Sequence, residues 1–327
     1  MALPKLPLFI LAPMDDVTDT VFRQIISSCA SPDLCFSEFV NVEGLMSDGR
    51  KRLLRKLERS KDEPPLIAHL WGLNPDDFEE IADQVASGKL AKEIGLEDNF
   101  GGIDLNMGCP VRAVTRMGAC SALMNNRDLA QDIIESTKKG AKGRLPISVK
   151  TRLGYSEIDP SWTQFLFSQN LDMLSIHLRT VKEMSLTNAH HEELERIKQE
   201  RDSLSRGTLL IANGDILSRG QGDKLINKYG IDGVMIGRGV FHDPYAFSKE
   251  SPWPKFTARE RAELFMTHLK LYESWADKPN KGVSRLNKYA KIYINGFDGA
   301  KELRTELALA HSVQQMLDRT GAFLQQA

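Results

Sequence analysis

Residues 103–110, IDLNMGCP, combine side-chain types that could deliver a proton to a bound molecule. An apolar run typical of a β-strand carries Asp104 and then breaks at a turn that presents Asn106 and Cys109. Pro110 has no backbone N–H group and a fixed φ, which suits the end of a strand. A thiol on such a turn is placed to meet a ligand. Cys109 alone could equally be a small apolar residue in a turn, so the surrounding sequence must decide.

Eight short apolar runs, including the one that leads to Cys109, are predicted to be the strands that position such residues. They cover residues 8–13, 34–40, 65–71, 102–107, 146–152, 172–178, 208–213 and 232–237. The stretches between them, such as 128–139 and 220–229, have the length and pattern of helices. Strands this apolar are buried on both faces, as in parallel sheets. Eight β/α units over about 250 residues predict an α/β fold of the (β/α)8 TIM-barrel type. A doubly wound sheet is the alternative, but no GxGxxG motif follows the first run.

The last quarter of the chain differs from the rest in pattern and charge. Residues 251–257, SPWPKFT, contain two prolines and are interpreted as a linker. Residues 258–327 predict a small C-terminal helical domain, which leaves residues 1–250 as the barrel domain. The formal charge is +4 over residues 251–327 and −5 over residues 1–250. An acidic body with a basic C-terminal part is an asymmetry that can position a nucleic acid.

Composition limits the class of protein. With 41% hydrophobic and 27% charged residues, the 327-residue chain is typical of a globular protein. No apolar run approaches the roughly 20 residues that span a bilayer, and the N-terminus lacks a signal-peptide pattern. The sequence therefore predicts a cytoplasmic protein with no membrane contact and no obligate protein partner. The four cysteines have no metal-ligand spacing, so no metal site is expected. Cys120 is interpreted as a small core residue.

Polar groups follow seven of the eight apolar runs. In a TIM barrel the carboxyl ends of the strands meet on the face that carries the chemistry. The residues concerned are Pro13, Met14 and Asp15; His69; Asn106 and Cys109; Lys150 and Arg152; His177 and Arg179; Asn213, Gly214 and Asp215; and Gly237 and Arg238. Any one of them could be a satisfied structural group, but so many on one rim predict an active site.

Two features of this rim point to a phosphorylated, electron-rich ligand. The glycine-bearing turns at 213–215 and 236–239 expose N–H groups ahead of helices, which is how such barrels hold phosphate. Lys150 and Arg152 alternate with apolar residues and point to the same side, where a cation could neutralise a ring that becomes negative on reduction. A snorkelling lysine at 150 and a hydrogen-bonded core histidine at 177 are the alternatives.

In these motifs the chain resembles the dihydrouridine synthases, flavoenzymes that reduce uridine in tRNA. The resemblance runs nearly end to end. Its motifs are LAPMDDVTD (11–19), LNMGCP (105–110) with the following RMGAC, SVKTRLG (148–154), IHLRT (176–180), IANGDI (211–216) and DGVMIGRG (232–239). The combination of LNMGCP with SVKTR is the specific one, because other flavin barrels share single motifs.

The resemblance implies non-covalently bound FMN across the barrel mouth, reduced by NADPH or NADH. Its cofactor-binding residues would be Pro13, Met14, Asp15, His69, Lys150, His177, Asn213, Gly214, Asp215, Gly237 and Arg238. Lys150 would lie by the pyrimidine edge of the flavin, and 213–215 with 237–238 would take its phosphate and ribityl end. Asn106 and Arg152 would line the space between flavin and uracil, and Arg179 would also contact substrate.

The expected reaction places hydride on C6 of uracil and a proton on C5. A thiol of ordinary pKa, about 8.5, is mostly protonated at neutral pH and can supply that proton, so Cys109 is the expected catalytic acid. Two positions depart from the family pattern: His69 stands where glutamine is usual, and Leu178 stands where glycine is usual.

The tail segment predicts contact with tRNA. Lys281, Arg285 and Lys288 have the spacing of one helical face, in the domain that the family uses to hold tRNA. A solvated basic face is the alternative. Phosphate contacts would position the RNA, and flipping of the target base would bring it to Cys109.

Two other functions fit parts of the sequence. A flavin barrel that acts on a free pyrimidine, such as a dihydroorotate dehydrogenase, also presents a cysteine or serine at the barrel mouth, but it needs no basic helical domain. An RNA-binding relative that has lost catalysis would be consistent with His69 and Leu178.

Overall fold

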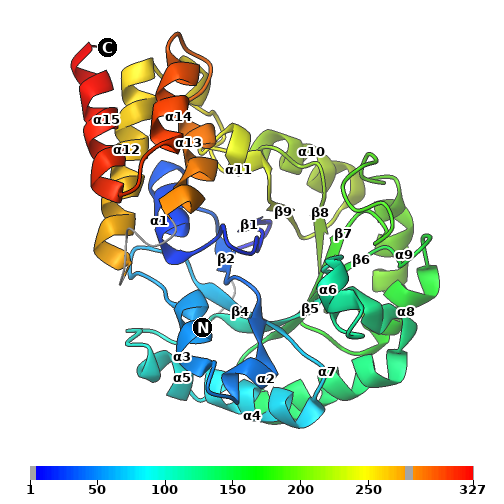
Figure 1. Ribbon diagram of the computed structural model, residues 1–327. Coiled ribbons are helices and arrows are strands. Elements are labelled where there is room, and N and C mark those ends of the chain that lie inside the picture. The colour runs from blue at the N-terminus through cyan, green and yellow to red at the C-terminus, as the bar shows by residue number, and fades with distance from the viewer. Residues whose placement is uncertain (1–4, 277–282, 327) are drawn as a thin grey trace.

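Eight parallel strands form a closed barrel in the computed structural model, which describes residues 5–276 and 283–326 (Figure 1). The barrel strands are β1 (Leu8–Leu11), β2 (Leu34–Phe36), β4 (Leu66–Trp71), β5 (Gly102–Met107), β6 (Ile147–Arg152), β7 (Met173–His177), β8 (Leu209–Asn213) and β9 (Gly233–Ile236). Pairing of β2 with β4 closes the barrel, and the two-residue β3 (Val40–Asn41) adds to β4 outside it. The predicted (β/α)8 TIM barrel is confirmed.

The strands are buried on both faces, as their apolar sequences require. Alternate residues of several strands form a small apolar cluster that includes Leu8, Ile10, Phe36 and Met235. The intervening residues, such as Phe9 and Leu11, belong to the larger core beneath the helices. The smaller cluster fills the inside of the barrel, so the barrel has a packed interior and opens only at its end.

Helices between the strands surround the barrel. The longer ones are α1 (Thr20–Cys29), α4 (Pro75–Ala86), α7 (Arg127–Ala141), α8 (Pro160–Ser168), α9 (Glu193–Leu204) and α10 (Arg219–Tyr229). The short ones are α2 (Val42–Leu45), α3 (Arg50–Leu54), α5 (Lys89–Glu93), α6 (Arg112–Thr115) and α11 (Gly239–His242). The helices expected at 128–139 and 220–229 are confirmed as α7 and α10. Most of the longer helices begin at a side-chain cap; α1, for example, begins where Asp19 accepts a hydrogen bond from the N–H of Phe22.

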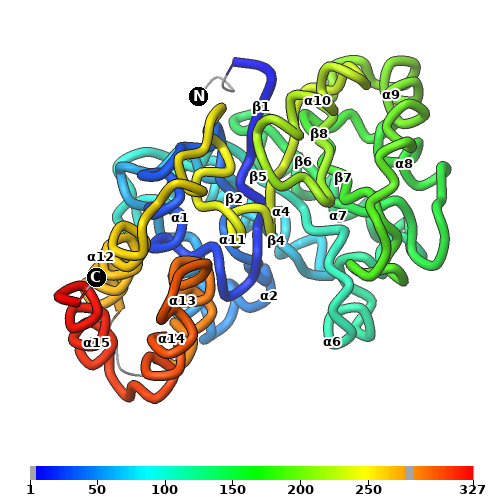
Figure 2. The backbone as a smooth tube through the Cα atoms, turned by 90° about the horizontal axis from the view of Figure 1, so that it is seen from above, coloured from blue at the N-terminus to red at the C-terminus, as the bar shows by residue number. Residues whose placement is uncertain are grey.

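Four further helices, α12 (Ala258–Trp275), α13 (Asn287–Tyr293), α14 (Ala300–Ala308) and α15 (Val313–Gln326), pack together beside α1 (Figures 1 and 2). In the segment at 251–257, which is predicted to be a linker, Trp253 is buried and the guanidinium of Arg261 lies 4.2 Å from its ring. The aromatic ring of Tyr289 stacks on Phe22 of α1, and its hydroxyl donates to the carbonyl of Val17 at 2.9 Å. These contacts attach the C-terminal helices to the loop that follows β1.

None of the helices in residues 5–276 and 283–326 is long and apolar enough to span a membrane. No group of three or more histidine, cysteine or acidic side chains there could hold a metal ion.

Candidate active site

A cavity of about 590 Å³ opens at the carboxyl ends of the barrel strands. It is bordered by the rim residues that the sequence singled out, apart from Arg179: Pro13, Met14, Asp15, His69, Asn106, Cys109, Lys150, Arg152, His177, Asn213, Gly214, Asp215, Gly237 and Arg238. His69 lies within β4 rather than at its end, because the strand continues to Trp71. The barrel brings together side chains that are up to 225 residues apart in sequence, from Pro13 to Arg238.

Four hydrogen bonds fix the turn that carries Cys109. Asn106 Oδ1 accepts hydrogen bonds from the N–H groups of Gly108, at 3.1 Å, and Cys109, at 3.0 Å. The hydroxyl of Ser121 donates to the carbonyl of Cys109 at 2.7 Å, and Arg152 Nε donates to that of Gly108 at 3.0 Å. The thiol, which is 7% exposed, therefore has a fixed position at the edge of the cavity.

The Cys109 thiol is more acidic than its sequence suggests. A hydrogen bond from Cys120 lowers the pKa of Cys109 to about 7, outweighing the opposing effect of burial. Cys120 adopts φ 53°, a left-handed conformation that is uncommon outside glycine, and it is fully buried beside Cys109. The interpretation of Cys120 as a small core residue was therefore incomplete. The ordinary pKa assumed for Cys109 was wrong for the same reason.

Substitution of Cys120 tests this interaction. Cys120→Ala should raise the pKa of Cys109 toward the ordinary range of a thiol, whereas Cys120→Ser, which keeps a donor, should leave it lower. Because only the thiolate is alkylated, the rate of Cys109 modification by iodoacetamide should reach half its maximum near pH 7 in the unmodified protein and at higher pH in the alanine variant. Mass spectrometry of the Cys109 peptide measures this rate. An unchanged midpoint in Cys120→Ala would contradict the assignment.

Two cations, the half-buried Lys150 and the buried Arg152, flank the thiol. Burial, and then the charge of Arg152, lower the pKa of Lys150 to about 8, and Lys150 Nζ donates to Asn213 Oδ1 at 3.3 Å. Burial lowers the pKa of Arg152 to about 10, and its Nη1 is engaged by the carbonyls of Thr180 and Met184. Both side chains remain mainly charged at pH 7, so this side of the cavity is positive.

Arg179 lies behind the cavity wall. Its guanidinium is 1% exposed and donates to the carbonyl of Thr187, to Asp215 and to His177 Nε2. Asp215 in turn lies 3.3 Å from Nη2 of the exposed Arg238. Arg179 and Asp215 thus orient the neighbours that line the cavity, and substrate contact by Arg179 stays a prediction.

His69 belongs to a buried network that the sequence analysis missed. Its Nδ1 donates to Asp104 Oδ2 at 2.6 Å, and the hydroxyl of Ser148 donates to the other oxygen of Asp104. The three residues are opposite one another in the parallel register of β4, β5 and β6. The sequence signal for this network is Asp104, a carboxylate in the middle of an apolar strand. The hydrogen bonds from His69 and Ser148 explain why a charged residue is tolerated there.

Three polar atoms of cavity-lining residues are buried without a partner among the described residues: His69 Nε2, Asn106 Nδ2 and His177 Nδ1. Buried polar atoms in folded proteins are normally hydrogen-bonded. Burial, followed by the nearby cations, holds the pKa of His177 well below its usual range, so its imidazole is neutral. Since its Nε2 accepts from Arg179, its Nδ1 carries the proton. Together with Lys150, these atoms offer donors and an acceptor to a polar, planar ligand.

The predicted basic helical face is only partly described. Lys281 lies outside the described residues. Arg285 is on a short 3-10 helix and exposed, whereas Lys288 is on α13 and donates to the carbonyl of Asp16. Arg285 and Lys288 therefore do not share one face of a continuous α-helix, as the spacing had suggested. Both instead line a second cavity, beside the loop that follows β1.

Two solved structures share the fold. Histamine dehydrogenase from Rhizobium sp. 4-9 matches with a TM-score of 0.54 and 13% identity, over 80% of this chain and 48% of its own. A complex of 2-naphthoyl-CoA reductase with 2-naphthoyl-CoA matches with a TM-score of 0.53 and 11% identity, over 72% of this chain and 48% of its own. The chain spans about half the length of each, and the likeness concerns the fold alone.

Sequence relatives are much closer. Proteins named "Probable tRNA-dihydrouridine synthase" are 46% identical in Staphylococcus aureus (strain COL), over 96% of this chain and 92% of theirs, and 44% identical in Staphylococcus epidermidis (strain ATCC 12228), over 98% and 94%. "Probable tRNA-dihydrouridine synthase 2" of Bacillus subtilis (strain 168) is 41% identical over 96% and 93%. The family model "Dihydrouridine synthase (Dus)" matches residues 10–327. This chain therefore belongs to the dihydrouridine synthase family.

Proposed function

We propose that this protein reduces the C5=C6 bond of specific uridines in tRNA to dihydrouridine, with bound FMN as cofactor and NADPH or NADH as reductant, in the cytoplasm. Family membership supports the reaction class. The observation that carries the proposal for this chain is the fixed, weakly acidic thiol of Cys109 in a cavity with the cations of Lys150 and Arg152 and with three buried polar atoms that have no partner among the described residues.

The residues of the cavity fit FMN. Lys150, with its ammonium held by Asn213, suits the ring edge that becomes negative on reduction. Gly214 adopts φ 115°, and a Cβ there would lie 3.2 Å from His177 Cδ2, so a side chain at this position would strain the turn and crowd His177. Arg238 at the same end is exposed and can meet a phosphate. FMN, when bound and reduced by the nicotinamide, supplies the hydride for C6 of uracil.

The chain's own residues hold the base and move the proton. Asn106 Nδ2 can donate to a uracil carbonyl, while its Oδ1 fixes the turn of Cys109. Cys109 Sγ gives its proton to C5, and the thiolate that forms is stabilised by the Cys120 hydrogen bond and the charge of Arg152. A pKa of about 7 is well matched to an acid that must be reprotonated from water at neutral pH.

Mapping of dihydrouridine in RNA from cells with and without the protein tests the proposal. Loss of dihydrouridine from defined tRNA positions is expected when the protein is absent. The purified protein should be yellow and lose its flavin absorbance on addition of NADPH. Turnover of free dihydroorotate with no tRNA modification would instead establish the free-pyrimidine enzyme, and tRNA binding without bound flavin would establish an RNA-binding relative.

Arg285 is the described basic residue best placed to contact RNA phosphate, since it is exposed and has no side-chain partner among the described residues. Arg285→Glu should weaken tRNA binding and reduce the slope of log K against log salt by about 1, the value for one lost phosphate contact. Filter binding at several salt concentrations measures both. Lys301→Glu, on the exposed part of α14, is the matched control and should change the slope less.

A further inference from the structure

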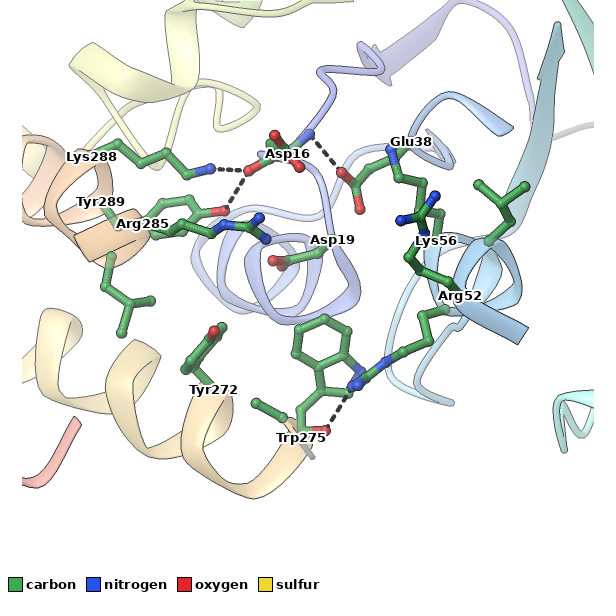
Figure 3. Close-up of a pocket in the computed structure, with 14 residues that line it drawn as sticks. Asp16, Asp19, Glu38, Arg52, Lys56, Tyr272, Trp275, Arg285, Lys288 and Tyr289 are labelled. Atoms are coloured by element: carbon green, nitrogen blue, oxygen red, sulfur yellow. Dashed lines mark hydrogen bonds between the residues drawn. The ribbon is translucent and has the colours of Figure 1, made fainter. Parts of the chain in front are cut away.

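A second cavity, of about 640 Å³, lies between the barrel and the C-terminal helices (Figure 3). Its walls come from the loop after β1, from α3 and the turn that follows it, from the end of α12, and from Arg285 to Tyr289. It is distinct from the cavity of Cys109, with which it shares no lining residue. The proposed reaction assigns no role to it.

The cavity has an aromatic side. Tyr272 and Trp275 are partly exposed, and their rings meet edge to face with centroids 6.0 Å apart. The guanidinium of Arg55 lies 4.5 Å from the Trp275 ring centre, and the indole N–H donates to Glu58 Oε2. Trp275 is therefore held in place, and both rings border the cavity as surfaces on which a planar group can stack.

Both positively and negatively charged side chains line the second cavity. Figure 3 shows Arg285 and Lys288 on one side, Arg52 and Lys56 on the other, and Asp16, Asp19 and Glu38 between them. Lys288 and Lys56 are engaged, by the carbonyl of Asp16 and the carboxylate of Asp15. The guanidinium groups of Arg52 and Arg285 have no hydrogen bond or ion pair among the described residues.

Asp19 offers an acceptor at the centre of the cavity. Its Oδ1 caps α1 by accepting from the N–H of Phe22 at 2.8 Å, and its Oδ2 has no partner in the described part of the chain. Burial raises the pKa of Asp19 to about 6, so the carboxylate remains mostly ionised at pH 7. A half-buried carboxylate whose second oxygen has no partner among the described residues is well suited to bind N–H donors.

We propose that this cavity binds a second nucleotide of the RNA, a guanosine other than the target uridine. The guanine ring would stack on the ring of Tyr272, meet that of Trp275 edge to face, and donate its N1–H and amino protons to Asp19, and its phosphates would meet Arg285 and Arg52. The inference rests on the proposed function, because it takes the substrate to be RNA.

The mixed lining argues for a nucleotide over simpler ligands. The three carboxylates disfavour a ligand that offers only phosphate, and the five cationic side chains that line the cavity, Arg52, Arg55, Lys56, Arg285 and Lys288, would repel a metal ion. A nucleotide can use side chains of both charges, because its base can donate hydrogen bonds to carboxylates while its phosphate is an anion that binds cations. Among the bases, guanine presents two adjacent donors on its Watson–Crick edge, which one carboxylate can accept.

Photocrosslinking identifies which nucleotide of the RNA lies at the cavity. A benzophenone amino acid replaces Tyr272, and the flavin-loaded protein is irradiated with full-length tRNA. A crosslink at one guanosine separate from the dihydrouridine position is expected. Crosslinks only at the target uridine, or crosslinks scattered over the RNA, would overturn the proposal. An absence of crosslinks would also overturn it, and this is the result expected if the cavity binds a peptide instead of RNA. This readout requires RNA binding and no catalysis.

Asp19→Asn tests the base contact without removing the helix cap, because asparagine caps helices as well as aspartate does. It replaces an acceptor with an amide that also donates, so the KM for tRNA should rise roughly ten- to hundred-fold, with little change in kcat. Asp159→Asn, at the N-cap of α8, is the matched control and should leave KM unchanged. An active Asp19→Asn enzyme with KM within twofold of the unmodified protein would overturn the proposal, whereas an unmodified protein that makes no dihydrouridine would overturn the proposed function instead.

Discussion

Cys109→Ala is expected to lower dihydrouridine formation by about 10²- to 10⁴-fold, the usual contribution of a positioned general acid. In the proposed reaction the Cys109 thiol is the proton donor, and alanine would supply no proton for C5. FMN content and NADPH oxidation should be retained, because the cations and unpartnered polar atoms that fit the cofactor are unaltered. Mass spectrometry of tRNA nucleosides and the absorbance of flavin and NADPH measure the two outcomes separately.

The partly buried Cys29, at the end of α1, provides the control for this change. Cys29→Ala removes a thiol far from the barrel mouth and should leave product formation near its original rate. Full dihydrouridine formation by Cys109→Ala would exclude Cys109 as the acid. Loss of flavin from Cys109→Ala would show that the thiol also supports the cofactor site.

Lys150→Met should impair the reductive step by about 10²- to 10³-fold, the effect of removing one preorganised group that stabilises developing charge. Methionine keeps the length and apolar stem of lysine but lacks the ammonium that Asn213 holds in the cavity. With a pKa of about 8, Lys150 is mainly charged at pH 7, and in the proposed cofactor site its charge would offset the negative charge that reduction adds to the flavin ring. Stopped-flow loss of flavin absorbance after mixing with NADPH measures the rate.

The purified variant should also contain less flavin per chain. Lys139→Met, at an exposed position on α7, removes the same charge outside the cavity and should change neither quantity. A Lys150→Met protein that keeps its flavin and is reduced at the original rate would show that Lys150 is a snorkelling lysine with no role in the cofactor site.

Much of the barrel could be predicted because its signals are local. Each apolar run in the sequence corresponds to a strand, and the helical patterns at 128–139 and 220–229 correspond to α7 and α10. Strand direction in a parallel barrel then puts all polar strand ends on one rim, so the cavity residues could be named without knowing any contact. The run at 34–40 was less regular, since the chain breaks between β2 and β3.

What the sequence did not predict depends on contacts between distant segments. The pairing of His69 with Asp104 requires the register of β4 against β5. The hydrogen bond from Cys120 to Cys109 requires a left-handed backbone at a residue that is not glycine. The inward position of Lys288 follows from the docking of α13 on the loop after β1, whereas its spacing from Arg285 suggested a shared outer face.

That loop has a further consequence. Within residues 15–19, Asp15 lines the cavity of Cys109, whereas Asp16 and Asp19 line the second cavity. Lys288 and Tyr289 donate hydrogen bonds to the backbone carbonyls of this span, at Asp16 and Val17. A ligand that shifts this short span from one side must alter the shape offered to the other. In the proposed complex, thermodynamic linkage would then require that cofactor and RNA change each other's affinity by the same factor. Residues 15–19 would thus couple binding at one cavity to binding at the other.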